Sequence, residues 1–209
     1  MLKRLSLFCV IYLVNCLAVN AQQVNPKFTF FTQGDTPSAW QWILADPESW
    51  WSPIDGNEGV SKSGKLSISS ADDATYPGAI KLKWNEKPLL GMANISGLTT
   101  DIARFEHRAE LVLAVKLDKR GNNVTLKMVC GDKCEGAINL DPFMEKTALN
   151  TWFAIPIPLD CFAEKGVDLS NVIQPFSIST TSEMTLNIAE ITLRAMPEGE
   201  EGCKPNPSN

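Results

Sequence analysis

Hydrophobic and polar residues alternate along much of the chain, as they do in strands that turn one face to a protein core. Residues 80–84 read Ile-Lys-Leu-Lys-Trp and residues 125–128 read Thr-Leu-Lys-Met, with apolar side chains at every second position. Residues 111–115, by contrast, are apolar throughout, which predicts a central strand covered on both faces. This period of two predicts a protein made almost entirely of antiparallel β-strands.

The alternation predicts strands at Phe28–Gln33, Trp40–Leu44, Lys65–Ser70, Ala79–Trp84, Glu110–Leu117, Val124–Cys130, Ala137–Leu140, Trp152–Leu159, Phe176–Thr180 and Met184–Leu193. In the last of these the apolar positions change from even to odd numbers, so we expect a bulge near Ala189 or Glu190. Pro156 and Pro158 cannot donate hydrogen bonds to a neighbouring strand. Their strand is therefore expected at a sheet edge, or with those positions directed outward.

Helical signals are few and short. Pro142–Leu149 predicts one or two turns after a cap at Asp141, and Cys161–Lys165 predicts a short turn closed by Gly166. The segment Asp46–Gly64 is rich in Pro, Gly, Ser and Asp and is predicted to be a loop. Many short strands separated by turn residues favour an all-β fold, a two-sheet β-sandwich of the jelly-roll type.

The first residues have the order of a secretory signal peptide. Two basic residues precede an apolar run, Leu5–Leu17, and small residues lead to an expected cleavage after Ala21. The apolar run is too short for a membrane span. A lipoprotein signal is disfavoured because Asn15 fits poorly before Cys16 as the lipid-carrying residue. We therefore expect a secreted protein, periplasmic or extracellular.

The chain then divides into a signal peptide at 1–21, one β-sandwich domain at 22–196, and a flexible acidic and Pro-rich tail at 197–209. Removal of residues 1–21 deletes two basic residues and no acidic ones. The remainder keeps 17 basic residues (19 minus 2) against 24 acidic ones, a net charge of −7. Because such a surface repels phosphates and no basic stripe is present, we expect no nucleic-acid partner.

Four cysteines remain after signal removal, namely Cys130, Cys134, Cys161 and Cys203. An even number in an exported protein indicates disulfides, and four cysteines allow three pairings. Cys130 and Cys134 are close enough to form a tight loop. A zinc site there is disfavoured because the one histidine of the chain, His107, is distant in sequence and zinc normally takes four ligands. No metal is expected at this pair.

Catalytic patterns are missing from the sequence. A retaining glycosidase needs two neighbouring carboxyl groups, whereas Asp141, Glu183 and Glu190 are isolated. His107 lies at a polar strand entry without a Gly-x-Ser-x-Gly nucleophile pattern, so we expect it to be exposed or to stabilise a turn. The loop Asp72–Thr75 offers oxygen ligands for a structural calcium ion, but an ordinary turn is favoured. The sequence therefore predicts no enzyme and no cofactor.

Six tryptophans are the better indication of function. Sugar rings stack their C–H faces on exposed aromatic rings, and nearby carboxylates and amides bind the hydroxyls. Because they are adjacent on an extended chain, Trp50 and Trp51 are expected to point in opposite directions, with at least one exposed. Core positions are favoured for Trp40, Trp42 and Trp152. The predicted sugar-binding residues are Trp50, Trp51 and Trp84 for stacking, with Asp46, Asn85 and Asp132 for hydroxyls.

The chain resembles the galactose-binding-like domain at the C-terminus of ExoP-type exo-glucanases of glycoside hydrolase family 3. The matching segments are Trp40–Leu44 with Asp46 and Trp50, Trp84-Asn85, Leu111–Val115, Met128–Cys134, Trp152, Ile157–Phe162, Gly166–Ser170, Pro175–Thr180 and Leu186–Ile191. The resemblance implies a jelly-roll sandwich similar to carbohydrate-binding modules. Cys203 lies outside the matching segments, so its pairing with Cys161 is a hypothesis.

The resemblance also implies an accessory role beside a glucan-cleaving enzyme. The catalytic domains of the family are absent from this sequence, so hydrolase activity is not carried over, and neither is a set of sugar-contacting residues. We therefore expect a non-catalytic carbohydrate-binding module for β-glucan or a related polysaccharide. The alternative is an interaction domain that docks on a glycoside hydrolase or a cell-surface partner.

Overall fold

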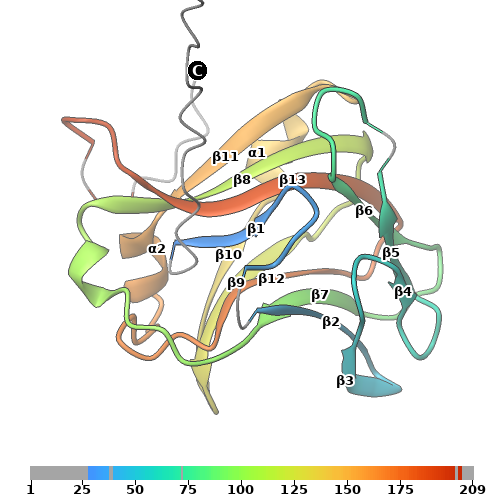
Figure 1. Ribbon diagram of the computed structural model, residues 1–209, viewed down its shortest axis with the longest axis horizontal. Coiled ribbons are helices and arrows are strands. Elements are labelled where there is room, and N and C mark those ends of the chain that lie inside the picture. Colours follow the sequence, from blue (N-terminus) through green and yellow to red (C-terminus); the bar gives the residue numbers. More distant parts are fainter. Residues whose placement is uncertain (1–27, 38–39, 72, 201, 204–209) are drawn as a thin grey trace, which may run out of the picture.

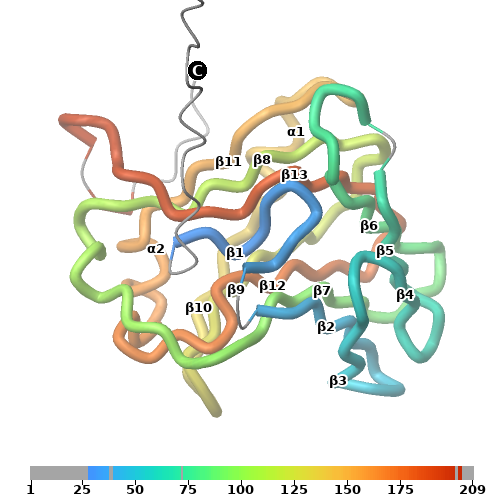
Figure 2. The backbone as a smooth tube through the Cα atoms, viewed as in Figure 1, coloured from blue at the N-terminus to red at the C-terminus, as the bar shows by residue number. Residues whose placement is uncertain are grey.

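The computed structural model describes residues 28–37, 40–71, 73–200 and 202–203, in which two antiparallel sheets pack face to face (Figures 1 and 2). This β-sandwich confirms the predicted all-β class. The expected signal peptide and the disfavoured lipoprotein position lie outside the described residues, as does Asp72. Within the described part of the chain, no helix is both long and apolar enough to pass through a membrane.

Sheet A has seven strands and sheet B has six. The order in sheet A is β11 (Trp152–Pro158), β8 (Ala109–Lys119), β13 (Met184–Ala195), β6 (Ile80–Trp84), β5 (Leu66–Ser70) and β4 (Gly59–Val60), and β1 (Thr29–Thr32) also pairs with β13. The order in sheet B is β10 (Cys134–Asn139), β9 (Thr125–Gly131), β12 (Gln174–Thr180), β7 (Gly91–Ser96), β2 (Gln41–Asp46) and β3 (Ser49–Pro53). In the described part of the chain, strands are also connected by short helices, namely η1 (Ala103–Phe105), α1 (Asp141–Glu145) and α2 (Leu159–Ala163).

The core lies between the two sheets, and aromatic side chains from both sheets pack against one another in it. Trp42 of β2 lies between Phe31 of β1 and Phe176 of β12, with ring centroids 5.5 and 5.9 Å apart in edge-on geometry. Phe31 belongs to sheet A and the other two rings to sheet B, so this contact fastens one layer to the other. Trp40 and Trp42 are both buried, as predicted. Trp152 is only half-buried and lies outside the core, so its predicted core position is wrong.

Two predictions about irregular strand positions are confirmed. In β13, Ile188 pairs with Val115 and Glu190 with Ala114, so Ala189 is the extra residue of a bulge. The bulge keeps apolar residues on both sides of it in the core. The proline-containing strand β11 pairs with β8 alone and forms an edge of sheet A.

Three strands differ from the sequence prediction. β3 and β4 lie inside Asp46–Gly64, which was expected to be a loop, and β7 was not expected at all. β3 lacks a simple alternation because two tryptophans are adjacent, and β7 reads Gly-Met-Ala-Asn-Ile-Ser, in which small and polar residues hide the period. β3 and β7 belong to sheet B, where β3 forms an edge and β7 lies near the middle.

The described residues contain two disulfides. Cys130 and Cys134 are linked at the tip of the β9–β10 hairpin, and Cys161 of α2 is linked to Cys203. The first closes a loop of sequence separation 4 and the second a segment of separation 42. The second link attaches Cys203, which follows β13 in the chain, to α2.

Candidate functional site

Asp46, predicted to bind sugar hydroxyls, is fully buried at the end of β2. One carboxylate oxygen accepts hydrogen bonds from the amides of Glu48 and Ser49, at 2.9 and 3.2 Å. The other accepts from the amide and hydroxyl of Ser63, at 2.7 and 2.8 Å. Burial raises the pKa of Asp46, but these bonds and one from the Ser61 side chain outweigh it and lower the pKa to about 2. The prediction is corrected: Asp46 holds the β2–β3 turn to the segment before β5.

Trp84 is also buried, with 0% of its surface exposed, so it cannot stack on a sugar and that prediction is wrong. Its indole nitrogen donates to the Gly91 carbonyl at 2.9 Å, which satisfies its polar atom inside the core. Asn85 follows it and is half-buried. The Asn85 side chain donates to the Gly64 carbonyl at 2.5 Å and accepts from the Lys87 amide at 2.9 Å. The nitrogen and the oxygen of the Asn85 side chain are therefore both hydrogen-bonded within the chain.

A buried lysine, Lys65, binds the backbone around Asn85. Lys65 has no exposed surface, and its ammonium donates to the carbonyls of Asn85, Lys87, Thr181 and Ser182 at 2.6 to 3.1 Å. Desolvation lowers the pKa of Lys65. Two of these carbonyls follow β6 and the other two lie in the β12–β13 turn, so Lys65 joins these two segments. These polar groups are bonded within the chain and stabilise the structure.

Asp132 is exposed at the tip of the β9–β10 hairpin. β10 forms one edge of sheet B, and β3, which carries Trp50 and Trp51, forms the opposite edge. The predicted sugar-binding residues are therefore not gathered into one site. Two of them are buried, one serves the fold, one lies at the far edge, and the two tryptophans of β3 remain.

Trp50 and Trp51 lie on the same face of sheet B, contrary to the expectation that they point in opposite directions. Leu44 pairs with Ser52 and Asp46 with Ser49, so Ala45 alone stands opposite both tryptophans in a β-bulge. The hydroxyls of Ser49 and Ser52 are hydrogen-bonded at 3.0 Å, which places these two serines on one side of β3.

Because Leu44 faces the core, the serine side of β3 is the inner one. Side chains alternate along a strand, so Trp50, next to Ser49, and Trp51, next to Ser52, both take the outer side. Their exposed fractions are 58% and 55%. The bulge therefore places two adjacent indoles on one solvent-facing surface at the edge of sheet B.

The outer face of sheet B continues from these tryptophans across all six strands. Residues paired directly between antiparallel strands share a face, and one such row consists of Pro53, Ile43, Asn94, Ser177, Lys127 and Ala137. Neighbouring positions on the same strands, such as Leu44, Ile95 and Phe176, belong to the core. The row is therefore an outer one, with small, amide and hydroxyl side chains in its middle.

Asn94 at the centre of this row has an unpaired polar atom. Only 3% of Asn94 is exposed, and its side-chain oxygen is buried without a hydrogen-bond partner among the described residues. Ile43 and Ser177 beside it are 0% and 3% exposed, although they face away from the core. Leaving an acceptor buried and unpaired costs about 1–3 kcal/mol. Sequence reasoning missed Asn94 because its strand, β7, was not predicted.

The outer face of sheet A is different, because a loop of the chain covers it. Trp152 of β11 pairs with Lys116 of β8, and Asp73 in the loop before β6 accepts from both side chains, at 3.1 and 2.5 Å. The bond from Lys116, with weaker ones from Trp152 and the loop amides, lowers the pKa of Asp73 to about 2. Tyr76 of the same loop packs on Trp152 with centroids 4.6 Å apart. The Asp73 carboxylate, one of the groups offered for calcium, is therefore bonded to Lys116 and Trp152 and serves as a loop clasp.

Comparisons with known proteins agree with the fold. The family model Exop_C, described as galactose-binding domain-like, matches residues 38–193. The fold is similar to the extra C-terminal domain (X) of an exo-1,3/1,4-β-glucanase from a Pseudoalteromonas species, with 18% identity, a TM-score of 0.64, and 83% of this chain and 95% of that domain covered. In the complete enzyme the match has 19% identity and a TM-score of 0.65, and covers 87% of this chain and 22% of the enzyme.

A family 30 carbohydrate-binding module of a Clostridium thermocellum cellulosomal cellulase has the same fold, with 12% identity, a TM-score of 0.58, and 83% of this chain and 98% of the module covered. A comparison with curated protein sequences finds no match. These results confirm the resemblance to the ExoP C-terminal domain and the sandwich fold. The matched domains are described as galactose-binding-like, as an extra C-terminal domain of a glucanase, and as a carbohydrate-binding module.

Proposed function

We propose that this chain, which belongs to the Exop_C family of galactose-binding-like domains, is a secreted module that binds a polysaccharide on the outer face of sheet B. β-Glucan or a related glucan is the proposed ligand, since the similar domain from the Pseudoalteromonas species is part of an exo-1,3/1,4-β-glucanase. The observation that carries the proposal is the bulge in β3, because it presents Trp50 and Trp51 together on this face.

The chemistry of this face suits a sugar chain. Two indoles offer flat apolar surface to the C–H faces of sugar rings. The side-chain oxygen of Asn94 is buried and unpaired among the described residues, so a sugar hydroxyl could donate to it only after this side chain turns outward, and such a bond would remove the cost of leaving the oxygen unsatisfied. Lys127 and Glu135, paired at 2.6 Å near the β10 edge, add polar groups at the far end of the row. Stacking with few hydrogen bonds gives a Kd of about 1 mM to 1 μM, that is, roughly −4 to −8 kcal/mol.

Secretion is part of the proposal and is supported independently. The order of charges and apolar residues at the start of the chain is that of a signal peptide. Two disulfides within the sandwich suit an oxidising compartment. A fusion of residues 1–21 to a reporter, followed by fractionation, tests export, and retention in the cytoplasm would contradict it.

Titration calorimetry and affinity electrophoresis against soluble glucans test the binding. The panel contains β-1,3-, β-1,4- and mixed-linkage glucans, with an α-glucan and a mannan as comparison sugars. We expect measurable heat and retardation with at least one β-glucan, and loss of both in Trp51→Ala. No binding to any polysaccharide, together with capture of a glycoside hydrolase from secreted extract, would favour the alternative of a docking domain.

A further inference from the structure

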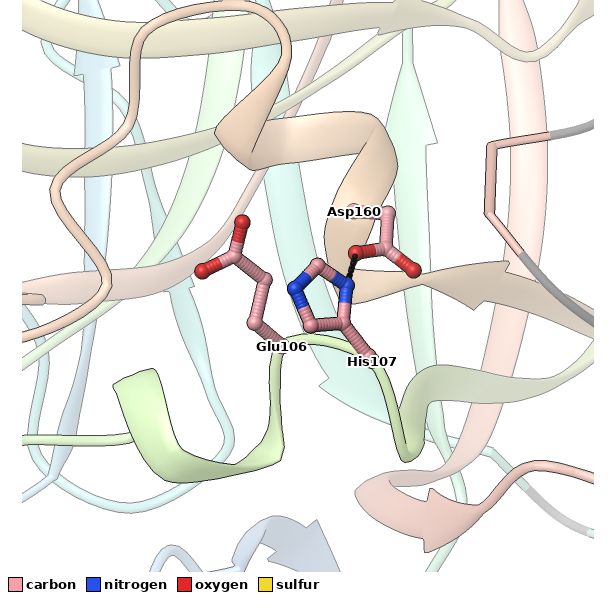
Figure 3. A group of neighbouring side chains, drawn as sticks. All are labelled: Glu106, His107 and Asp160. Carbon is pink, nitrogen blue, oxygen red and sulfur yellow. Dashed lines mark hydrogen bonds and ion pairs between the residues drawn. The ribbon is translucent and has the colours of Figure 1, made fainter.

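A second polar cluster lies away from the outer face of sheet B, where the chain enters β8. Glu106 and His107 follow η1, and Asp160 lies in the first turn of α2, which packs against β8 and β11. One donor atom from each of these residues can be chosen so that all three lie within 4.8 Å of one another. Figure 3 shows the imidazole ring of His107 between the two carboxylates.

Asp160 is the unusual member of this cluster, because it is a carboxylate with only 4% of its surface exposed. One oxygen lies 2.6 Å from Nδ1 of His107, and the other is buried without a partner among the described residues. A carboxylate at this distance fixes the proton of a neutral imidazole on Nδ1. The lone pair of His107 is therefore on Nε2, the nitrogen that lies on the Glu106 side of the ring (Figure 3).

This arrangement is that of a metal ligand with a supporting carboxylate. Histidines that bind metals usually donate the other ring N–H to a carboxylate, which fixes the tautomer and raises the basicity of the ligating nitrogen. Here the His107 side chain is 80% exposed while that of Asp160 is 6% exposed, so the ligating side of the ring faces solvent and its support is internal. Glu106 adds a carboxylate oxygen to the exposed side.

We propose that Nε2 of His107 and the carboxylate of Glu106 bind a zinc ion, with Asp160 as the positioning residue behind the imidazole. Zinc accepts nitrogen and oxygen ligands together at about 2.0–2.2 Å, whereas calcium and magnesium prefer oxygen alone. Glu106 and His107 are adjacent and not fully buried, so their side chains can close on an ion. Water completes the coordination, and the added positive charge offsets the buried, partly unpaired Asp160.

The single histidine of the chain makes the test specific. Zinc chloride is titrated into the full chain, purified without a histidine tag, while the imidazole resonances of His107 are followed by NMR. We expect a saturable shift at one zinc per chain. Glu106→Gln should weaken binding at least tenfold, and Asp160→Asn should weaken it about 10–100-fold, as outer carboxylates do at other sites. Glu164→Gln, an exposed change near the end of the same helix, serves as the control and should leave it unchanged.

Two results would overturn the proposal. The His107 resonances could stay unshifted by zinc, or they could shift with the same concentration dependence in Glu106→Gln as in the unmodified chain, which would mean a lone exposed imidazole only. If Asp160→Asn does not fold, Glu106→Gln decides alone, because its side chain is on the exposed side. Far- and near-ultraviolet circular dichroism of each variant identifies loss of folding.

Discussion

The outer faces of the two sheets are built from similar strands but differ in their hydrogen bonding. Polar side chains on sheet A are paired within the chain, whereas a central one on sheet B has an atom that is unpaired in the described part of the chain. On sheet A, Lys116 and Trp152 both donate hydrogen bonds to Asp73 of the loop that packs on them. On sheet B, Asn94 of β7 has a buried oxygen without a partner among the described residues, and two exposed tryptophans lie on β3, with β2 between the two strands. The difference teaches that a polar, aromatic surface suits a ligand when its groups are not already paired within the chain.

Removing both tryptophans of β3 should produce the largest difference between the faces. We expect Trp50→Ala with Trp51→Ala to weaken glucan binding at least a hundredfold, about 2.7 kcal/mol, since the stacking surface is lost. The free energy of unfolding should change by less than about 1 kcal/mol because both rings are more than half exposed. Calorimetry and urea unfolding measure the two quantities. Trp152→Ala on sheet A is the matched control, and equal loss of binding in it would break the comparison.

Two asparagines offer a matched pair across the faces. Asn187 is 1% exposed and donates to the Lys116 carbonyl at 3.3 Å, whereas the Asn94 oxygen has no partner among the described residues. We expect Asn187→Ala to destabilise the fold by about 1–2 kcal/mol without changing glucan affinity. Asn94→Ala should weaken glucan binding about tenfold, with little change in stability. The reverse assignment of effects, measured by the same two methods, would show that Asn94 is a structural residue.

The loop clasp on sheet A should matter for stability alone. Asp73→Asn removes the charge that Lys116 and Trp152 contact, so the loop should open more readily and the melting temperature should fall by a few degrees. Binding of glucan at 25 °C should stay as in the unmodified chain. A change in affinity larger than about threefold would mean that the two faces are coupled through the core.

Acid should lower the free energy of unfolding through Asp46 and Asp73, which are bonded within the fold. This is the smallest of the expected effects, and it is absent near neutral pH. The pKa values of Asp46 and Asp73 are lowered to about 2, so between pH 2 and about 4 the unfolded chain binds more protons than the folded one. The stabilisation from these groups is therefore complete above about pH 4 and is lost as the pH falls toward 2. Melting curves should show it, with a smaller loss in Asp73→Asn. A decline that begins near pH 6 would point to other groups.

The sequence predicts the strand pattern well where one face is apolar and one is charged. The alternation in β6 and β9, the bulge in β13 and the edge position of β11 all follow from local side-chain chemistry. The outer face of sheet B was harder to predict, because it lacks such contrast. Asn94 is in a strand made largely of small and polar residues, so no period of two is visible.

The candidate site was predicted only in part. Trp50 and Trp51 are exposed, but Trp84 and Asp46 are buried, because long-range partners determine burial and these partners are not adjacent in sequence. Asp46 meets Ser63 across 17 positions, and Trp84 meets Gly91 after a turn. The shared face of the two tryptophans depends on the pairing of β3 with β2, which a single strand does not encode.

The bulge in β3 also has a consequence for how domains of this fold diverge. The two indoles share a face only because one residue of β2 stands opposite two of β3. Deletion of one residue at this point of an edge strand would leave a single ring on the surface, and it would leave the other five strands of sheet B paired as they are. A change of strand length, with no substitution in the core, is therefore a short mutational route from one arrangement of exposed aromatic rings to another.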